Sequence, residues 1–186
     1  MKRSLIAIAT LAGFSTLVAA AEPRISFPAD YKSFKNYLSL DRVGNDDQVI
    51  RLFANDVASA GPSKDGSLPN GSILVGEVYK AKLNDKGEVI KSDLGRRIRG
   101  KLAAIAVMEK RQGWGEAFSE DLRNGDWDFA IFSPDGKRLN KDLKSCRSCH
   151  APRQDTDHRF SLDRPDHRPA TVRARGHPLA VVGDLD

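Results

Sequence analysis

The sequence predicts an α+β domain that is mainly antiparallel β-sheet with a few helices, one of which carries a Cys-x-x-Cys-His motif at residues 146–150. Two observations favour this class. Segments 48–54, 72–83 and 127–132 are rich in β-branched, aromatic and aliphatic residues. Pairs such as Asp-Gly and Asn-Gly mark turns between them, and helical periodicity is rare. With 186 residues, the chain is long enough for one ordinary domain with a sizeable core.

The first predicted element is a short amphipathic helix. Tyr31, Phe34 and Leu38 recur at the spacing of one helix face. Asp30 precedes them and is a suitable N-cap residue, because its carboxylate can accept a free backbone N–H of the first turn. We therefore expect a helix that begins just after Asp30.

A strand, a loop and a hairpin are expected next. Residues 48–54 are apolar and β-rich, which predicts a strand. Residues 59–71 contain Gly-Pro, Asp-Gly and Asn-Gly pairs, which predict a loop. Residues 72–83 predict a second strand, and the turn sequence at 84–87 returns the chain toward residues 89–90 as a hairpin.

The remaining elements lead up to the cysteine motif. Residues 101–108 form a nearly continuous apolar run that fits a buried strand, although the pattern alone also allows a helix. Large apolar residues alternate along 127–132, and Ser-Pro-Asp-Gly at 133–136 ends that strand in a turn. Residues 140–144 then lead into the helix that carries the motif.

The motif Cys146-x-x-Cys149-His150 contains both cysteines of the chain. On a short helix, residues i, i+3 and i+4 share one face. Both sulfurs can then reach the two vinyl groups of one porphyrin while the imidazole faces the iron. This spacing is the attachment signature of c-type haem. It predicts one covalent haem per chain, bound by Cys146, Cys149 and His150, with His150 as the iron ligand.

Three other interpretations of the motif stay open. A redox Cys-x-x-Cys needs no following histidine and usually lies near the start of a βαβ unit. A structural zinc site needs four ligands, so His158, His167 and His177 would have to complete the set. A disulfide across two intervening residues would close a very small loop and stabilise little.

The N-terminus has the features of a secretory signal peptide over residues 1–21. A basic start precedes an apolar run at 5–18 and small residues at 19–21. The run is shorter than the roughly 20 residues of a spanning helix, and no other run is long enough. We therefore expect export to the periplasm, where haem attachment takes place. The mature chain is expected to hold a haem domain at 22–163 and a poorly ordered tail at 164–186, which is rich in Pro, Arg and Gly.

Positive charge gathers around the motif. The formal net charge of +5 falls to +3 when Lys2 and Arg3 leave with the signal peptide. Residues 144–175 hold eight basic and four acidic side chains. This surplus would steer an acidic redox partner toward the haem edge, although a solvated tail explains the same charges. We expect no nucleic-acid binding, because the basic residues are interleaved with Asp and Pro and no recognition motif accompanies them.

The sequence offers no clear sixth ligand for the iron. Electron-transfer cytochromes commonly use a methionine, and no methionine follows the motif. Met108 is the one methionine left after signal cleavage, and it lies in an apolar run, where a methionine is usually a core residue. His158, His167 and His177 are alternatives, but two of them lie in the Pro-rich tail. An open or water-bound iron is therefore expected.

Further short motifs follow one another along the chain. The first half of the chain has Phe27-Pro28-x-x-Tyr31, then Val49-Ile50-Arg51, then Pro-Asn-Gly-Ser with the strand to residue 79. The second half has Val107-Met108-Glu109-Lys110 with Gly113-Trp114, then Trp127-Asp128-Phe129, the cysteine motif and Thr156-Asp157-x-x-Phe160. In this order they resemble the cytochrome P460 family. The resemblance covers residues 27–162, nearly the whole mature domain. The cysteine motif alone is generic, whereas its order after the Pro-Asn-Gly-Ser strand and the Trp-containing strand is specific.

The resemblance implies a β-rich homodimer with one c-type haem per chain, ligated by His150 and open on its other side. Members either oxidise hydroxylamine or, in the cytochrome c′-β branch, bind nitric oxide and similar small ligands. The oxidising members carry a lysine, cross-linked to the porphyrin, directly before the glutamate of the strand. This chain has Gly76 before Glu77. Lys80 would lie about 13 Å further along a strand, and both Lys80 and Lys82 are expected to face solvent.

The family's distal carboxylate is harder to place. Glu109 is the candidate, and the alternative is a surface glutamate beside two basic neighbours. Phe34, Phe53 and Phe132 are candidates to crowd the open side of the haem.

Three functions follow from these observations. The first is an exported monohaem c-type cytochrome with an open axial site that binds nitric oxide or a similar small ligand. The second is an oxidoreductase acting on hydroxylamine or nitric oxide, which Gly76 opposes. The third is an electron-transfer cytochrome, which needs a sixth ligand that the sequence does not supply.

Overall fold

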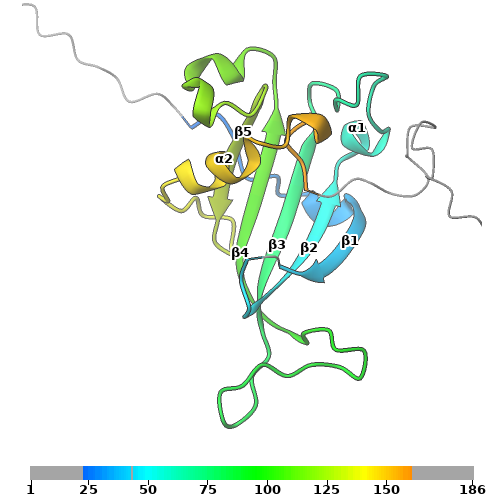
Figure 1. Cartoon of the computed structure of the whole chain (residues 1–186), viewed down its shortest axis with the longest axis vertical. Coiled ribbons are helices and arrows are strands. Elements are labelled where there is room, and N and C mark those ends of the chain that lie inside the picture. The colour runs from blue at the N-terminus through cyan, green and yellow to red at the C-terminus, as the bar shows by residue number, and fades with distance from the viewer. Residues whose placement is uncertain (1–22, 43, 161–186) are drawn as a thin grey trace, which may run out of the picture.

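The computed structural model describes residues 23–42 and 44–160. Within them, five strands form one antiparallel sheet in which each strand pairs with the next along the chain (Figure 1). The strands are β1 (Lys35–Asp41), β2 (Gln48–Ala54), β3 (Ile73–Ala81), β4 (Arg99–Lys110) and β5 (Trp127–Phe132). The predicted class, α+β with mainly antiparallel sheet, is confirmed.

The helical elements of the described residues are all short. They are the α-helices α1 (Asp56–Ser59) and α2 (Lys144–His150) and the 3₁₀ helices η1 (Tyr31–Ser33), η2 (Trp114–Ala117), η3 (Glu120–Leu122) and η4 (Gln154–Thr156). Helix α1 begins after Asn55, whose side-chain oxygen accepts the N–H of Ala58. Helix α2 has no such side-chain cap, so contacts with the sheet must hold it in place.

The strand predictions were largely correct. Segments 48–54 and 127–132 correspond to β2 and β5, β3 lies within 72–83, and β4 contains 101–108, which rules out the helical alternative there. The predicted hairpin turn is confirmed by the backbone hydrogen bond from Gly87 N–H to the Asn84 carbonyl, 3.0 Å. A second turn at residues 92–95 was not predicted, and the two turns together make an arm that extends from the end of the sheet (Figure 1).

The predicted amphipathic helix after Asp30 was wrong. Only Tyr31–Ser33 is helical, as the short turn η1, and Asp30 makes no side-chain capping bond. Phe34 is already extended, with φ −65° and ψ 153°, and β1 follows directly. The helix-like spacing therefore arose because one 3₁₀ turn precedes a strand. Leu38 and Leu40, two residues apart, pair with Leu52 and Ile50 of β2, respectively.

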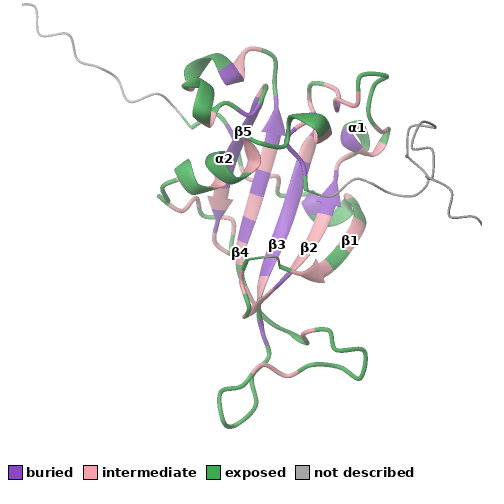
Figure 2. Cartoon of the chain, in the orientation of Figure 1, coloured by how far each residue is buried: buried purple, intermediate pink, exposed green. Residues whose placement is uncertain are grey.

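The two faces of the sheet are covered differently. On one, the N-terminal segment packs over the strands, and a cluster forms from Ile25, Tyr31, Phe53, Val75, Ile105, Val107, Ala130 and Phe132. We call this the buried face, and Figure 2 shows buried residues concentrated on the central strands. The opposite face carries α2, because Phe129 alternates with Ala130 along β5 and its ring contacts that of His150. We call it the α2 face.

Some predictions concern residues outside those described. The signal peptide at 1–21 and the tail at 164–186 are among them, so the proposed boundaries of the haem domain remain predictions. In residues 23–42 and 44–160, no helix combines the length and the apolar character needed to cross a membrane.

Candidate haem-binding site on the α2 face

The three motif residues lie together on α2. Cys146 is partly buried, Cys149 is exposed, and both are free thiols, so the alternative of a disulfide between them is not realised. Burial raises the pKa of the Cys146 thiol. His150 lies one residue after Cys149, and the spacing i, i+3, i+4 brings the three side chains to one side of the helix. This is the arrangement that attachment of one porphyrin requires.

Arg147, between the two cysteines, anchors α2 to the sheet. It is 5 % exposed, and its guanidinium donates to the Asp128 carboxylate of β5. The guanidinium carbon also lies 3.4 Å from the ring centroid of Phe118. The Arg147 carbonyl accepts a bond of 3.2 Å from the Asn124 side chain. Burial lowers the pKa of Arg147, and the neighbouring Asp128 opposes that shift, so the charged pair holds the helix at a fixed place.

The His150 ring is oriented by a backbone carbonyl. Its Nδ1 lies 2.6 Å from the carbonyl oxygen of His158. A carbonyl can only accept, so Nδ1 carries the proton and Nε2 keeps its lone pair. Burial lowers the pKa of His150, although the bond to His158 opposes the shift, and a lowered pKa favours the neutral ring that ligates metals. The rings of Phe129 and Phe160 pack against it at 5.1 and 4.8 Å between centroids.

A row of apolar residues crosses the α2 face beside this histidine. Cross-strand pairing joins one residue from each strand in the order Leu38, Leu52, Gly76, Ala106 and Ile131. All except Gly76 are partly exposed, whereas the residues of the buried face are covered.

The middle of this row consists of small residues, and the neighbouring Ile50 and Leu52 side chains already fill the space above Gly76. A Cβ added at Gly76 would lie 3.1 Å from Ile50 Cδ1, tighter than ordinary contact. The α2 face thus offers a partly exposed apolar surface, with glycine and alanine at its centre and His150 beside it. A flat, largely apolar cofactor such as haem fits this surface, since burying apolar area is favourable.

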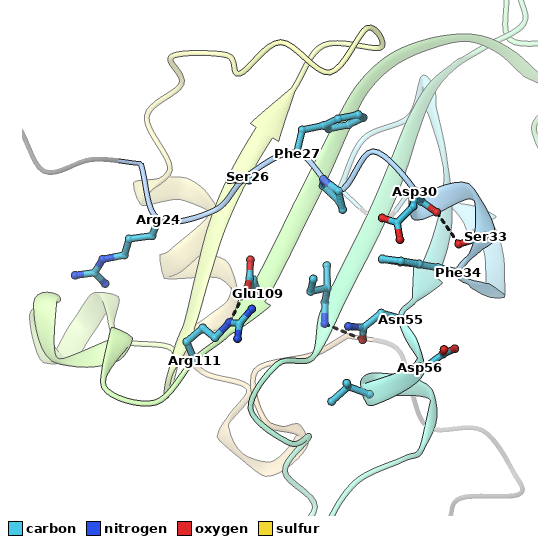
Figure 3. A pocket seen from close by; sticks show the side chains of 13 residues that line it. Arg24, Ser26, Phe27, Asp30, Ser33, Phe34, Asn55, Asp56, Glu109 and Arg111 are labelled. Atoms are coloured by element: carbon cyan, nitrogen blue, oxygen red, sulfur yellow. Dashed lines mark hydrogen bonds and ion pairs between the residues drawn. The ribbon is translucent and has the colours of Figure 1, made fainter.

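Glu109 lies on the other side of the sheet, and the interpretation of it as a surface residue was wrong. It is 8 % exposed, alternates with Met108 along β4, and bonds to Arg111 at 2.7 Å. It lines a pocket of about 630 Å³ together with Phe27 and Phe34. Figure 3 shows these side chains around the pocket. Phe27 and Phe34 pack against the cluster of the buried face. Glu109 therefore points away from α2, which argues against a distal role.

Three phenylalanines and two lysines were also named from the sequence. Phe53 and Phe132 belong to the cluster of the buried face and Phe34 packs against it, so all three lie across the sheet from His150, which argues against them as residues that crowd the haem. Lys80 and Lys82 are exposed, as predicted.

Of the four candidate sixth ligands, His167 and His177 lie outside the described residues, and the other two have other surroundings. Met108 is on the α2 face but packs against a second core cluster that contains Trp127. His158 directs Nδ1 toward the His150 carbonyl, 3.2 Å away. Among residues 23–42 and 44–160, no group of three or more His, Cys, Asp or Glu side chains is placed to hold a metal ion.

Fold and site together define a class, that of haem-binding proteins in which the helix with the Cys-x-x-Cys-His motif packs against a β-sheet. The model of the family Cytochrome P460 matches residues 28–161, most of the chain. The chain therefore belongs to the cytochrome P460 family and is a haem-binding cytochrome. A comparison with curated proteins gave no match.

Loss of the charge on Asp128 should loosen α2. Asp128→Asn leaves the buried Arg147 guanidinium without its anion, which typically costs about 3–5 kcal/mol. We expect denaturant titration of the holoprotein to show a fall of that order in the free energy of unfolding. Asp47→Asn is the matched control, because its pair with Lys80 is exposed and should be worth less than about 1 kcal/mol. Equal, small effects of both substitutions would contradict the anchoring role.

Proposed function

We propose that the protein is an exported monohaem c-type cytochrome whose iron has one protein ligand and binds nitric oxide or a similar small ligand on its open side. The observation that carries the proposal is the state of His150: Nδ1 is bonded to the His158 carbonyl, which leaves Nε2 for the iron. When bound, the haem would supply an iron that takes a small ligand at its sixth position.

Cys146 and Cys149 would attach the porphyrin covalently, one haem per chain. Arg147 and Asp128 would keep both thiols at the edge of the α2 face by fixing the helix between them. The apolar row through Gly76 and Ala106 would exclude water from one side of the cofactor. Export to the periplasm and assembly as a homodimer remain expectations from the first 21 residues and from the family, as does an acidic redox partner.

Few side chains in the described part of the chain could bind the iron at its sixth position. Met108 is engaged with the Trp127 cluster, and the His158 ring is directed at the His150 carbonyl. Electron transfer through a six-coordinate iron would need one of these two side chains to move, or a ligand from His167 or His177 outside the described residues. The electron-carrier function is therefore less well supported than ligand binding.

An oxidoreductase acting on hydroxylamine or nitric oxide is the second candidate. Membership of the family supports this function, but two features of the α2 face argue against it. Gly76 stands where the resemblance places the cross-linking lysine, and Lys80 is turned to Asp47, with 2.6 Å between Nζ and the carboxylate. Along β4, the residues that alternate onto the α2 face are Ala104, Ala106 and Met108, none of which has a carboxylate.

Covalent attachment is the first test. Protein made in cells competent for cytochrome c maturation should have, under denaturing mass spectrometry, the mass of the mature chain plus one haem. Cys146→Ser with Cys149→Ser should abolish the added mass, since no other cysteine is available. A wild-type mass without haem from the same cells would refute the proposal.

The second test separates ligand binding from oxidation. Without a side chain at Gly76 the cross-link cannot form there, so the haem-bearing peptide should carry no second peptide, and ferrous protein should bind nitric oxide at one per haem. Hydroxylamine turnover with an artificial electron acceptor should be slow or absent. A peptide containing Lys80 or Lys82 attached to the haem, or rapid hydroxylamine turnover, would instead favour the oxidoreductase.

A further inference from the structure

The carbonyl that orients His150 belongs to the loop after α2, and the backbone of this loop has an uncommon conformation. Asp157 has φ 50° and the next residue, His158, has φ 60°, so two consecutive residues other than glycine are left-handed. Such a conformation costs free energy for residues with a Cβ atom and persists only where surrounding contacts impose it. Some contact must therefore keep the His158 carbonyl facing Nδ1.

The bonds within the loop do not tie it to the sheet. The His158 N–H donates to the Arg153 carbonyl at 2.6 Å, and Thr156 Oγ1 donates to the Arg159 carbonyl at 2.6 Å. All of these residues belong to the same segment. They shape the loop, but they would move with it if it turned away from α2.

An ion pair makes the connection to the sheet. Lys110 Nζ, at the end of β4, lies 2.9 and 3.0 Å from the two carboxylate oxygens of Asp157. The Lys110 and Asp157 side chains are 11 % and 10 % exposed, so water weakens their attraction little. The same carboxylate accepts the N–H of Leu68 at 2.8 Å. Asp157 thus joins the loop to β4 and to the segment before β3, one residue before the carbonyl that faces His150.

We propose that Lys110 and Asp157 are positioning residues for His150: their ion pair holds the left-handed loop, and the loop holds the carbonyl that accepts the Nδ1 proton. The proposal rests on the proposed function, in which Nε2 of His150 binds the haem iron. A strong bond from Nδ1 makes the imidazole a better electron donor to the metal. The pair therefore strengthens the iron–histidine bond and stabilises the oxidised iron, which keeps the reduction potential low.

The test is Asp157→Asn in the holoprotein, observed by resonance Raman spectroscopy of the ferrous state and by redox titration. The amide cannot replace the buried charge pair, so the carbonyl should move from Nδ1. We expect a lower iron–histidine stretching frequency and a more positive midpoint potential. Lys110→Gln removes the pair from the strand and leaves the loop sequence intact. It should shift both quantities in the same direction, and it carries the test if Asp157→Asn yields no folded holoprotein.

Two further variants separate positioning from a general loss of charge. Asp155→Asn makes the same charge change at an exposed site of the same loop and should leave both quantities at wild-type values. Lys110→Arg keeps the ion pair, so the iron–histidine stretching frequency and the midpoint potential should stay near their wild-type values. If Asp157→Asn and Lys110→Gln match Asp155→Asn while the wild type has an iron–histidine stretch, the positioning role is refuted and the proposed function stands. If the wild type itself has no such stretch, the proposed function fails.

Discussion

Unequal coverage of the two faces of the sheet is the constraint on which the rest of the structure depends. The N-terminal segment closes the buried face with Tyr31 and its neighbours. The α2 face is closed at one end, where α2, the following loop and the segment with Ala58 and Leu68 pack on it. Further along, Leu52, Ala106 and Ile131 stay partly exposed. Partly exposed apolar surface is unfavourable in water, and a covalently attached haem would bury it. The fold and the cofactor would then stabilise each other.

Charged pairs at low exposure hold the motif against this surface. Arg147 and Asp128 fix the helix that bears the thiols, and Lys110 and Asp157 fix the loop that faces His150. Both pairs end on the last two strands, β4 and β5, so one rigid edge of the sheet would position the cysteines and the histidine together. A buried pair contributes little net stability but is costly to break, which suits a role in placing groups.

Local sequence patterns were sufficient for the strands and for the motif. β2 and β5 were predictable because alternation between turn signals has few alternatives. The spacing of Cys146, Cys149 and His150 is local, so the sequence alone shows the motif, and their role in haem attachment remains a prediction. The helix predicted after Asp30 failed because a 3₁₀ turn and a strand together imitated helical spacing. The side of the sheet that Glu109 faces depends on how β4 pairs with β3 and on which face the N-terminal segment covers, and neither is written in the sequence.

The groups that hold the site were not predictable for a different reason. Asp128 lies 19 residues before Arg147, and Lys110 lies 47 before Asp157, so only the tertiary fold brings them together. The acceptor for Nδ1 of His150 is a backbone carbonyl. Every residue has one, so the residue types in the sequence do not indicate which carbonyl accepts the bond. Arg147 gave one usable signal, since a charged residue between the two cysteines of the motif must either face solvent or find a partner.

The coordination of the ferrous iron tests the central claim most directly. With His150 as the single protein ligand, optical and resonance Raman spectra of the reduced protein should be those of a five-coordinate, high-spin haem. Carbon monoxide should then bind without displacing a side chain. A six-coordinate, low-spin spectrum in both oxidation states, lost when Met108 is replaced by alanine, would show that the iron has a second protein ligand and would contradict the account.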